Sequence, residues 1–403
     1  MADEWRQSTW GEEISLEYGK ALRAYDETQG SYRVFGANGP VGWTSEPLAL
    51  GPGVILGRKG AYRGVQYSRD PFFVIDTAYY VVPKRELDMR WLYYAIRHYK
   101  LGEIDDGSPI PSTTRAAVYV QELEVPPPDE QRAIADILGT LDDKIELKQR
   151  MNETLEAIAR ALFKSWFVDF DPVRAKVEGR NAGLPKRLTE LLPESLDDSE
   201  AGGIPNGWTS RGLDEIARFL NGLALQKFPA TDQNWLPVIK IAQLRAGSAI
   251  NADRASKDIP PDYIVADGDV LFSWSGSLEC VLWAGGRGAL NQHLFKVDSI
   301  EYPKWFCYLW IHRHLDDFRH IAAGKATTMG HIQRHHLSEA KVVVPPRDLL
   351  KALDPIFSPL IESQWRRKVQ SRILEELRDT LLPKLISGEL RVQDAERHLE
   401  VVL

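Results

Sequence analysis

The stretch Val125-Pro126-Pro127-Pro128-Asp129-Glu130-Gln131 has a counterpart 219 positions later that begins Val344-Pro345-Pro346, and a long run of regularly spaced apolar residues follows each copy. Proline is favoured in the first turn of a helix, and a three- and four-residue apolar spacing is typical of a coiled-coil seam. We therefore expect two helices of roughly 35 residues, each about 50 Å long. Because such helices need their apolar stripe covered, the two copies should pack antiparallel against each other.

Polar residues interrupt the seam in both copies. Lys148 and Asn152 stand within the first, and Gln364, Arg367 and Ser371 within the second. The residues expected to pack the helices together or to bind partners are Leu141, Ile145, Leu155, Leu162, Trp166, Phe167, Leu360, Leu374, Leu381 and Leu385.

The repetition extends over nearly the whole chain. Trp5 matches Trp208 at a shift of 203, Gly53-Val54-Ile55-Leu56 matches Gly268-Asp269-Val270-Leu271, and Trp91-Leu92-Tyr93-Tyr94 matches Trp305-Phe306-Cys307-Tyr308. The shift grows to 219 before the helices, so insertions lie in the front part of each repeat. The front parts contain short β-branched and aromatic runs such as Ala78-Tyr79-Tyr80-Val81-Val82, which predict strands, and helices are expected at 89–99 and 304–314.

These patterns predict an α+β fold with an internal pseudo-two-fold repeat: two similar globular domains separated by two long, antiparallel packed helices. The predicted boundaries are 1–125 and 206–344 for the globular domains and 126–175 and 345–403 for the helical regions. Residues 176–205 are rich in glycine and proline and form the predicted linker, with a short helix at 186–192.

Composition bounds the function only loosely. Lys and Arg number 50 against 57 Asp and Glu, a net charge of −7 that gives no support to a nucleic-acid partner. No apolar run approaches the ~18 residues of a membrane span, and two cysteines do not make a disulfide framework. We expect a cytoplasmic protein with no membrane partner.

Catalytic patterns are missing. Asp129 with Glu146-Leu147-Lys148 fits a loose nuclease pattern, but these residues are spread along one predicted helix and should not share a metal. Gly324-Lys325-Ala326 lacks the remainder of a phosphate-binding loop. His331 and His335 stand four residues apart, a spacing that suits a metal, but without companion ligands. We predict no catalytic residue, no metal and no cofactor bound by this chain.

Two pairs of matched loops carry the predicted DNA contacts. The segment 57–64 mixes cations and an aromatic residue with glycines, and its repeat counterpart at 272–277 carries hydroxyls and an indole. Ser112-Thr113-Thr114-Arg115 is matched with Lys325-Ala326-Thr327-Thr328. Arginine and lysine bind guanine or phosphate, and hydroxyls bind phosphate. The predicted DNA-binding residues are Arg58, Lys59, Tyr62, Arg63, Thr113, Thr114, Arg115, Ser273, Trp274, Ser275, Lys325, Thr327 and Thr328.

Longer strings resemble a known family. Ala161-Leu162-Phe163-Lys164-Ser165-Trp166-Phe167-Val168-Asp169-Phe170-Asp171-Pro172, Ile204-Pro205-Asn206-Gly207-Trp208 and Leu381-Leu382-Pro383-Lys384-Leu385-Ile386-Ser387-Gly388-Glu389-Leu390 resemble the specificity subunit of type I restriction-modification systems. The second copy departs from the family's helix opening by carrying Arg347-Asp348-Leu349.

The resemblance implies two target-recognition domains, each reading one half of a split, asymmetric site in double-stranded DNA, and helices that set the spacer. It also implies two methyltransferase subunits that bind S-adenosylmethionine, and restriction subunits, the motor-nuclease, that use ATP and Mg. On this reading the chain is not an enzyme. Two alternatives stay open: a scaffold whose two heads bind proteins, and a metal-dependent nuclease that uses Glu146.

Overall fold

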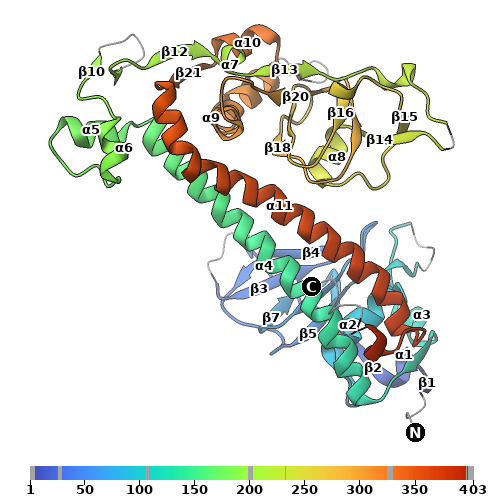
Figure 1. Ribbon diagram of the computed structural model, residues 1–403. Helices are drawn as coiled ribbons and strands as arrows, with labels where there is room; N and C mark the ends of the chain where they lie inside the picture. The colour runs from blue at the N-terminus through green and yellow to red at the C-terminus, as the bar shows by residue number, and fades with distance from the viewer. Residues whose placement is uncertain are drawn as a thin grey trace. The chain divides into compact units, whose positions relative to one another are not determined.

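The computed structural model describes residues 5–25, 30–105, 107, 109–197, 203–231, 233–324, 330–395 and 397 (Figure 1). The chain divides into two compact units: unit 1 is Met1–Ile145 with Leu374–Leu403, and unit 2 is Glu146–Ile373. The units divide the chain differently from the predicted domains because each long helix gives one part to each unit.

Unit 1 contains three sheets and the helices that cover them. The predicted helix at 89–99 is α2, whose N-cap Asp88 accepts hydrogen bonds from the backbone N–H groups of Arg90 (2.9 Å) and Trp91 (2.8 Å). The elements of unit 1 before the long helices are β1 (Arg6–Thr9), α1 (Trp10–Glu13), β2 (Ile14–Tyr18), β3 (Tyr32–Gly36), β4 (Gly39–Thr44), β5 (Gly53–Gly57), β6 (Val65–Ser68), β7 (Phe72–Val74), β8 (Ala78–Pro83), α2 (Met89–His98), η1 (Leu101–Glu103), α3 (Arg115–Tyr119) and β9 (Glu122–Val125).

After the end of α4, unit 2 continues with α5 (Asp171–Val177), which lies across the boundary predicted between the helical region and the linker. The elements that fall in the predicted linker are α6 (Lys186–Glu190), β10 (Leu196–Asp197) and β11 (Ile204–Pro205). The predicted helix at 304–314 extends further, to Ala323. The remaining elements are β12 (Thr209–Gly212), α7 (Leu213–Ile216), β13 (Arg218–Asn221), η2 (Leu225–Lys227), β14 (Trp235–Ile239), α8 (Ile241–Ala246), β15 (Arg254–Ser256), η3 (Pro261–Tyr263), β16 (Ile264–Val265), β17 (Val270–Ser273), β18 (Cys280–Leu282), β19 (Gly288–Leu290), β20 (Leu294–Asp298), α9 (Lys304–Ala323), α10 (Arg334–Glu339) and β21 (Lys341–Val344).

The sheets of the two units have the same topology. A four-stranded sheet of order β2-β8-β5-β6 in unit 1 corresponds to β13-β20-β17-β18 in unit 2. The two-stranded sheet β1-β9 corresponds to β12-β21, and β4-β3-β7 corresponds to β15-β14-β19, to which unit 2 adds β16. The predicted α+β fold with an internal repeat is therefore confirmed.

The two long helices are α4 (Pro128–Phe167) and α11 (Arg347–Ile386), and they pair antiparallel within each unit. In unit 1, Arg378 of α11 donates to Asp142 of α4 at 2.7 Å. In unit 2, Lys148 donates to Gln370 at 2.7 Å, and further along the pair the ring of Trp166 lies 5.5 Å from that of Phe357. Among the helices of the described residues, none has the length and apolar character needed to cross a membrane.

Most of the predicted seam residues take part in the core. Leu141, Ile145, Leu374, Leu381 and Leu385 are buried in the core of unit 1. Of the predicted seam residues in unit 2, Phe167 is buried in the core. Three others, Leu162, Trp166 and Leu360, are partly buried and pack against that core. Leu155 is only partly buried, and the α4 positions that are fully covered instead are Ala159 and Phe163.

The polar interruption of the seam is buried as well. Asn152, Gln364 and Ser371 are 9%, 2% and 7% exposed, and the Asn152 Oδ1, Gln364 Nε2 and Ser371 Oγ atoms have no hydrogen-bond partner among the described residues. A buried polar atom without a partner costs about 1–3 kcal/mol. Polar residues at seam positions specify the register of paired helices at a cost in stability. We call Asn152, Gln364 and Ser371 the polar layer; these residues therefore restrict the register of the helix pair at a cost in folding stability.

Unit 2 also encloses a polar cavity of about 230 Å³ between α4, β18, α9 and α11. Burial raises the pKa values of the Tyr308 hydroxyl and the Cys280 thiol and lowers that of the Lys368 ammonium. Burial, together with the positive charge of Arg160, lowers the pKa of His312 to about 3. His312 is therefore neutral in the folded protein over the whole physiological range.

The polar layer predicts a stabilising substitution. Gln364→Leu removes a buried amide without a partner at nearly constant volume and should raise the free energy of unfolding by about 1–2 kcal/mol. The measurement is urea denaturation of the whole chain followed by circular dichroism. Gln149→Leu is the matched control, since Gln149 lies exposed on the partner helix α4. An equal or smaller gain in Gln364→Leu than in the control would contradict this account.

His312 predicts a dependence of stability on pH. The unfolded chain binds a proton at this imidazole below pH 6.5, whereas the folded chain does so only near pH 3. The neutral imidazole of His312 therefore makes its full contribution to the free energy of unfolding above pH 6.5. This contribution is lost as the pH falls toward 3, by about 1.4 kcal/mol per pH unit. His312→Gln should flatten the fall in unfolding free energy between pH 6.5 and pH 5. His320→Gln, an exposed position of the same helix, should not; equal slopes in the two variants would refute the assignment.

Candidate nucleic-acid interface

Four separate segments of unit 1 meet at one end of the sheet β2-β8-β5-β6. Backbone hydrogen bonds join them: Gly19 N to Ala78 O (3.1 Å), Arg58 N to Thr77 O (2.9 Å), Gly60 N to Pro111 O (3.0 Å) and Thr113 N to Arg58 O (2.9 Å). We call this arrangement of 18–20, 58–60, 76–79 and 111–115 the four-segment junction of unit 1. It brings together both of the loops that the sequence predicted to bind DNA in the first repeat.

Unit 2 builds the same junction from 221–223, 274–276, 292–295 and 330–334. The equivalent bonds are Gly222 N to Leu294 O (3.0 Å), Trp274 N to His293 O (3.4 Å), Gly276 N to Gly330 O (2.8 Å) and Ile332 N to Trp274 O (3.0 Å). Glycine is required in both: a Cβ would lie 2.1 Å from Ile75 O at Gly19 and 2.2 Å from Asn291 O at Gly222. The two junctions therefore share one backbone frame.

The junction of unit 1 carries cations around an exposed aromatic ring. The Arg58 guanidinium donates to the backbone oxygen of Asp76 (2.9 Å) and lies 5.1 Å from the Tyr18 ring. The Arg115 guanidinium lies 4.2 Å from the same ring and pairs with Glu17 at 3.5 Å. Tyr18 itself is 48% exposed. This group offers cations for phosphate or guanine and a ring on which a base can stack.

In unit 2 an indole replaces the guanidinium. The Trp274 Nε1–H donates to the backbone oxygen of Gln292 (3.1 Å), the residue equivalent to Asp76, and to Asn221 Oδ1 (2.9 Å), at the position of Tyr18. The Arg334 guanidinium lies 5.8 Å from the Phe295 ring, as Arg115 lies 5.9 Å from the Tyr79 ring. The same backbone acceptor is thus reached by different side chains in the two units.

Three of the hydroxyls predicted to contact DNA are buried. Thr113 and Ser273 are fully buried and Ser275 is 3% exposed. Thr113 Oγ1 donates to Ile104 O (3.0 Å), Ser273 Oγ donates to Ser277 O (2.7 Å), and Ser275 Oγ lies 3.1 Å from His293 Nδ1. These hydroxyls satisfy neighbouring polar groups inside each unit.

The remaining predicted residues differ in their surroundings. Lys59 and Tyr62 are exposed, Tyr62 by 77%. Arg63 donates to the backbone oxygens of Gly102 (2.8 Å) and Gly60 (2.8 Å), so its guanidinium holds the loop against η1. Thr114 caps α3 by accepting from Ala117 N (3.3 Å). For Lys59, Tyr62 and Arg63, DNA contact stays a prediction, as it does for Thr114; Lys325, Thr327 and Thr328 lie outside the described residues.

The counterpart of Ser112-Thr113-Thr114-Arg115 is His331-Ile332-Gln333-Arg334, so the match to 325–328 is wrong. Isolated β-bridges join Lys59 to Ser112 and Ser275 to His331 at equivalent positions. The constant shift of 219, carried back from Val125 toward the N-terminus, leads directly from Arg115 to Arg334. Sequence reasoning missed the following junction residues: Tyr18, Asn221, Gln292, His293, His331 and Arg334.

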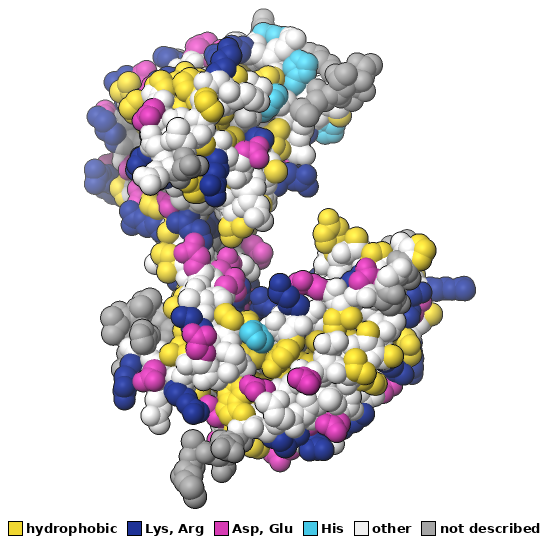
Figure 2. All heavy atoms as spheres, turned by 90° about the vertical axis from the view of Figure 1, so that its right-hand side faces the viewer, with side chains coloured by type: hydrophobic (Ala, Val, Ile, Leu, Met, Phe, Trp, Pro, Cys, Tyr) yellow, Lys and Arg dark blue, Asp and Glu magenta, His cyan; other side chains and the backbone are white. Residues whose placement is uncertain are grey.

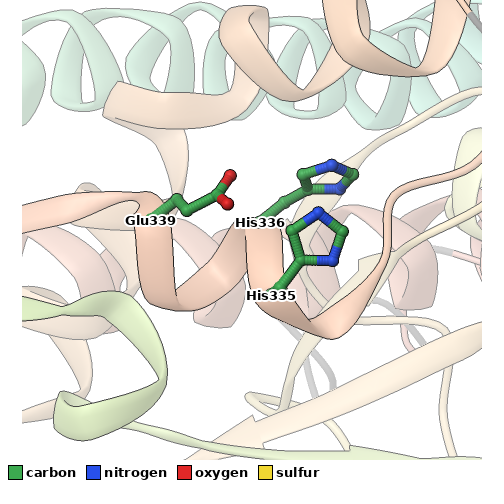
Figure 3. Close-up of side chains that lie close together, drawn as sticks. All are labelled: His335, His336 and Glu339. Carbon is green, nitrogen blue, oxygen red and sulfur yellow. The ribbon is translucent and has the colours of Figure 1, made fainter.

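Histidines gather in unit 2. Figure 2 shows them on the upper body, and Figure 3 shows His335, His336 and Glu339 of α10 close together. Their ligand atoms lie within 4.8 Å of one another, whereas His331 precedes this helix. However, His336 Nδ1 accepts from the backbone N–H of Gln333 (2.9 Å). A metal on the other ring nitrogen would require a proton on Nδ1, so metal binding would break this cap.

The residues of the loose nuclease pattern make separate surface contacts. Asp129 pairs with Arg132, Glu146 with Arg150, and Lys148 donates to Gln370. Nothing brings them to a common ligand in the described part of the chain. On the face shown in Figure 2, cations and carboxylates are interspersed, so the net charge of −7 is not collected into one acidic surface there.

Comparison with known proteins identifies the fold and the family. A solved S subunit of a type I restriction-modification system from M. genitalium is similar, with a TM-score of 0.62 and 17% identity over 95% of this chain and 96% of that one. The specificity subunit of the type I restriction enzyme MjaIX of Methanocaldococcus jannaschii is 28% identical over 328 residues, 78% of this chain and 72% of that protein. The specificity subunit of the type I restriction enzyme HindI of Haemophilus influenzae is 27% identical over 339 residues, which are 70% of this chain and 71% of that protein.

The family model of the type I restriction modification DNA specificity domain matches twice, at residues 41–157 and 205–362. Each match spans parts of one predicted recognition domain and the start of the long helix that follows it. The resemblance predicted from the sequence is thereby confirmed, and the chain belongs to the family of type I restriction-modification DNA specificity proteins.

Proposed function

We propose that this chain is the sequence-specific DNA-binding subunit of a type I restriction-modification complex, and that each unit reads one half of a bipartite, asymmetric site. The observation that carries the proposal is the pair of four-segment junctions, which share a backbone frame and differ in side chains. A repeated frame with different side chains suits two readers of different half-sites, because base edges are distinguished by donor and acceptor pattern.

The chemistry of the junctions differs in a way that supports asymmetric reading. In unit 1, Arg58 and Lys59 are suited to guanine oxygen and nitrogen acceptors, and Tyr18 to stacking. In unit 2, Gln292 carries an amide, a side chain that pairs bidentately with adenine. We expect the two half-sites to differ accordingly.

The family supports a non-catalytic role for the chain itself. We propose that two methyltransferase subunits dock on α4 and α11 and that these helices set the spacer between the half-sites. The modification subunits would bind S-adenosylmethionine, and restriction subunits would supply the ATP- and Mg-dependent motor and nuclease. With partner subunits gripping most of the backbone phosphates, a chain of net charge −7 needs only local contacts to DNA.

Methylation mapping tests the proposed function directly. The chain is expressed with the methyltransferase subunit of its system in a host without adenine methylation, and N6-methyladenine is located by genome sequencing. We expect methylation at one asymmetric two-part motif. A stable complex that leaves the genome unmethylated, or methylates it without a motif, would exclude sequence-specific reading and favour a protein scaffold.

Replacing the cations of the first junction should affect one half-site only. Arg58→Ala with Lys59→Ala should weaken discrimination there by about 1–3 kcal/mol for each base contact, so one half of the methylated motif becomes degenerate. Arg33→Ala is the matched control, since its guanidinium lies 4.5 Å from the Trp43 ring in the same unit but outside the junction. Degeneracy in both halves, or in neither, would contradict this placement.

A further inference from the structure

Because the two junctions share one backbone frame, their side chains can be compared position by position. Most side chains at equivalent positions differ between them, as expected if they read different bases. One cation is the same in both. The differing pairs are Tyr18 and Asn221, Lys59 and Ser275, Arg58 and Trp274, Asp76 and Gln292, and Thr77 and His293. The common pair is Arg115 and Arg334, each the first residue of a short helix, α3 or α10.

Both arginines lie near an aromatic ring at an equivalent position, and Arg115 is held in addition by the Tyr18 ring and by Glu17. Arg115 lies 5.9 Å from the ring of Tyr79 on β8, and Arg334 lies 5.8 Å from the ring of Phe295 at the equivalent position of β20. Arg334 is exposed, and in the part of the chain that the structure describes no carboxylate pairs with it. A ring beneath a guanidinium restricts its orientation while leaving its N–H donors directed outward.

We propose that Arg334 contacts a backbone phosphate of the second half-site, with Arg115 as its counterpart in the first, while the differing positions read the bases. The inference rests on the proposed function. A side chain that is identical in two readers of different half-sites cannot carry the difference between them, whereas phosphate is the same in both. The guanidinium fork matches phosphate geometry, and its support on the ring lowers the entropy lost on binding.

The assignment separates affinity from sequence preference. Loss of one phosphate contact weakens binding to all sequences alike and reduces the slope of log affinity against log salt by about 0.9. Loss of a base contact relaxes one position of the motif instead. The two roles are therefore distinguished by the salt slope and by the motif, neither of which a purely structural arginine would change.

The experiment measures binding of the complex of this chain with its methyltransferase subunits to two duplexes, one carrying the methylated motif and one of scrambled sequence, between 50 and 200 mM salt. Arg334→Ala should weaken binding to both duplexes by the same factor. Over this fourfold range of salt, the wild type should lose about 3–4-fold more affinity than the variant. Arg334→Lys keeps the charge and should keep the slope, and thermal unfolding should be unchanged in both variants.

Arg254→Ala is the matched control, because the Arg254 guanidinium lies 4.2 Å from the Trp235 ring in the same unit but outside the junction. An unchanged slope in Arg334→Ala, an equal loss in Arg254→Ala, or a methylated motif that changes in one half would overturn the assignment. A wild-type complex that binds both duplexes with equal affinity would instead count against the proposed function.

Discussion

The antiparallel pairing of α4 and α11 is the constraint on which the rest of the chain depends. Each helix has an apolar face that must be covered, because most of the stability of a helix in a protein comes from packing that face. Each unit takes part of both helices into its core. Leu141 and Leu385 are fully buried in unit 1, as are Phe167 and Phe357 in unit 2. Unit 1 is therefore made of two separate segments, Met1–Ile145 and Leu374–Leu403, whereas unit 2 is the continuous segment Glu146–Ile373. The buried polar residues Asn152, Gln364 and Ser371 restrict the register in which the helices pair.

Each of the two units contains the same four-segment junction. The bonds that join its four segments run between backbone atoms, so they place few demands on the side chains. The exceptions are Gly19 and Gly222, where any side chain would collide with a carbonyl group. Arg58 and Trp274 show the result, because a guanidinium and an indole donate to equivalent backbone oxygens. A frame of this kind allows the exposed residues to vary while the fold is retained.

Several errors of the sequence-based prediction share one physical cause. Ser275 and Lys59 occupy equivalent positions, yet the serine is buried beside His293 while the lysine is exposed. Arg63 has the chemistry of a DNA contact, but backbone carbonyls of the loop and η1 occupy its donors. Residue type shows what a side chain can bind. Which partner it meets depends on segments far away in the sequence, such as 102–104 for both Arg63 and Thr113.

The sequence by itself determined the internal repeat, the two long helices, the α+β class and the family. Apolar periodicity and proline positions are features of one segment, and the repeat is found by comparing the sequence with itself. Only the tertiary structure decided which loop side chains face outward and which side chains of the four distant segments meet at each junction. Burial and partnership in a junction arise where four distant segments meet. A pattern read along one segment at a time does not contain that information.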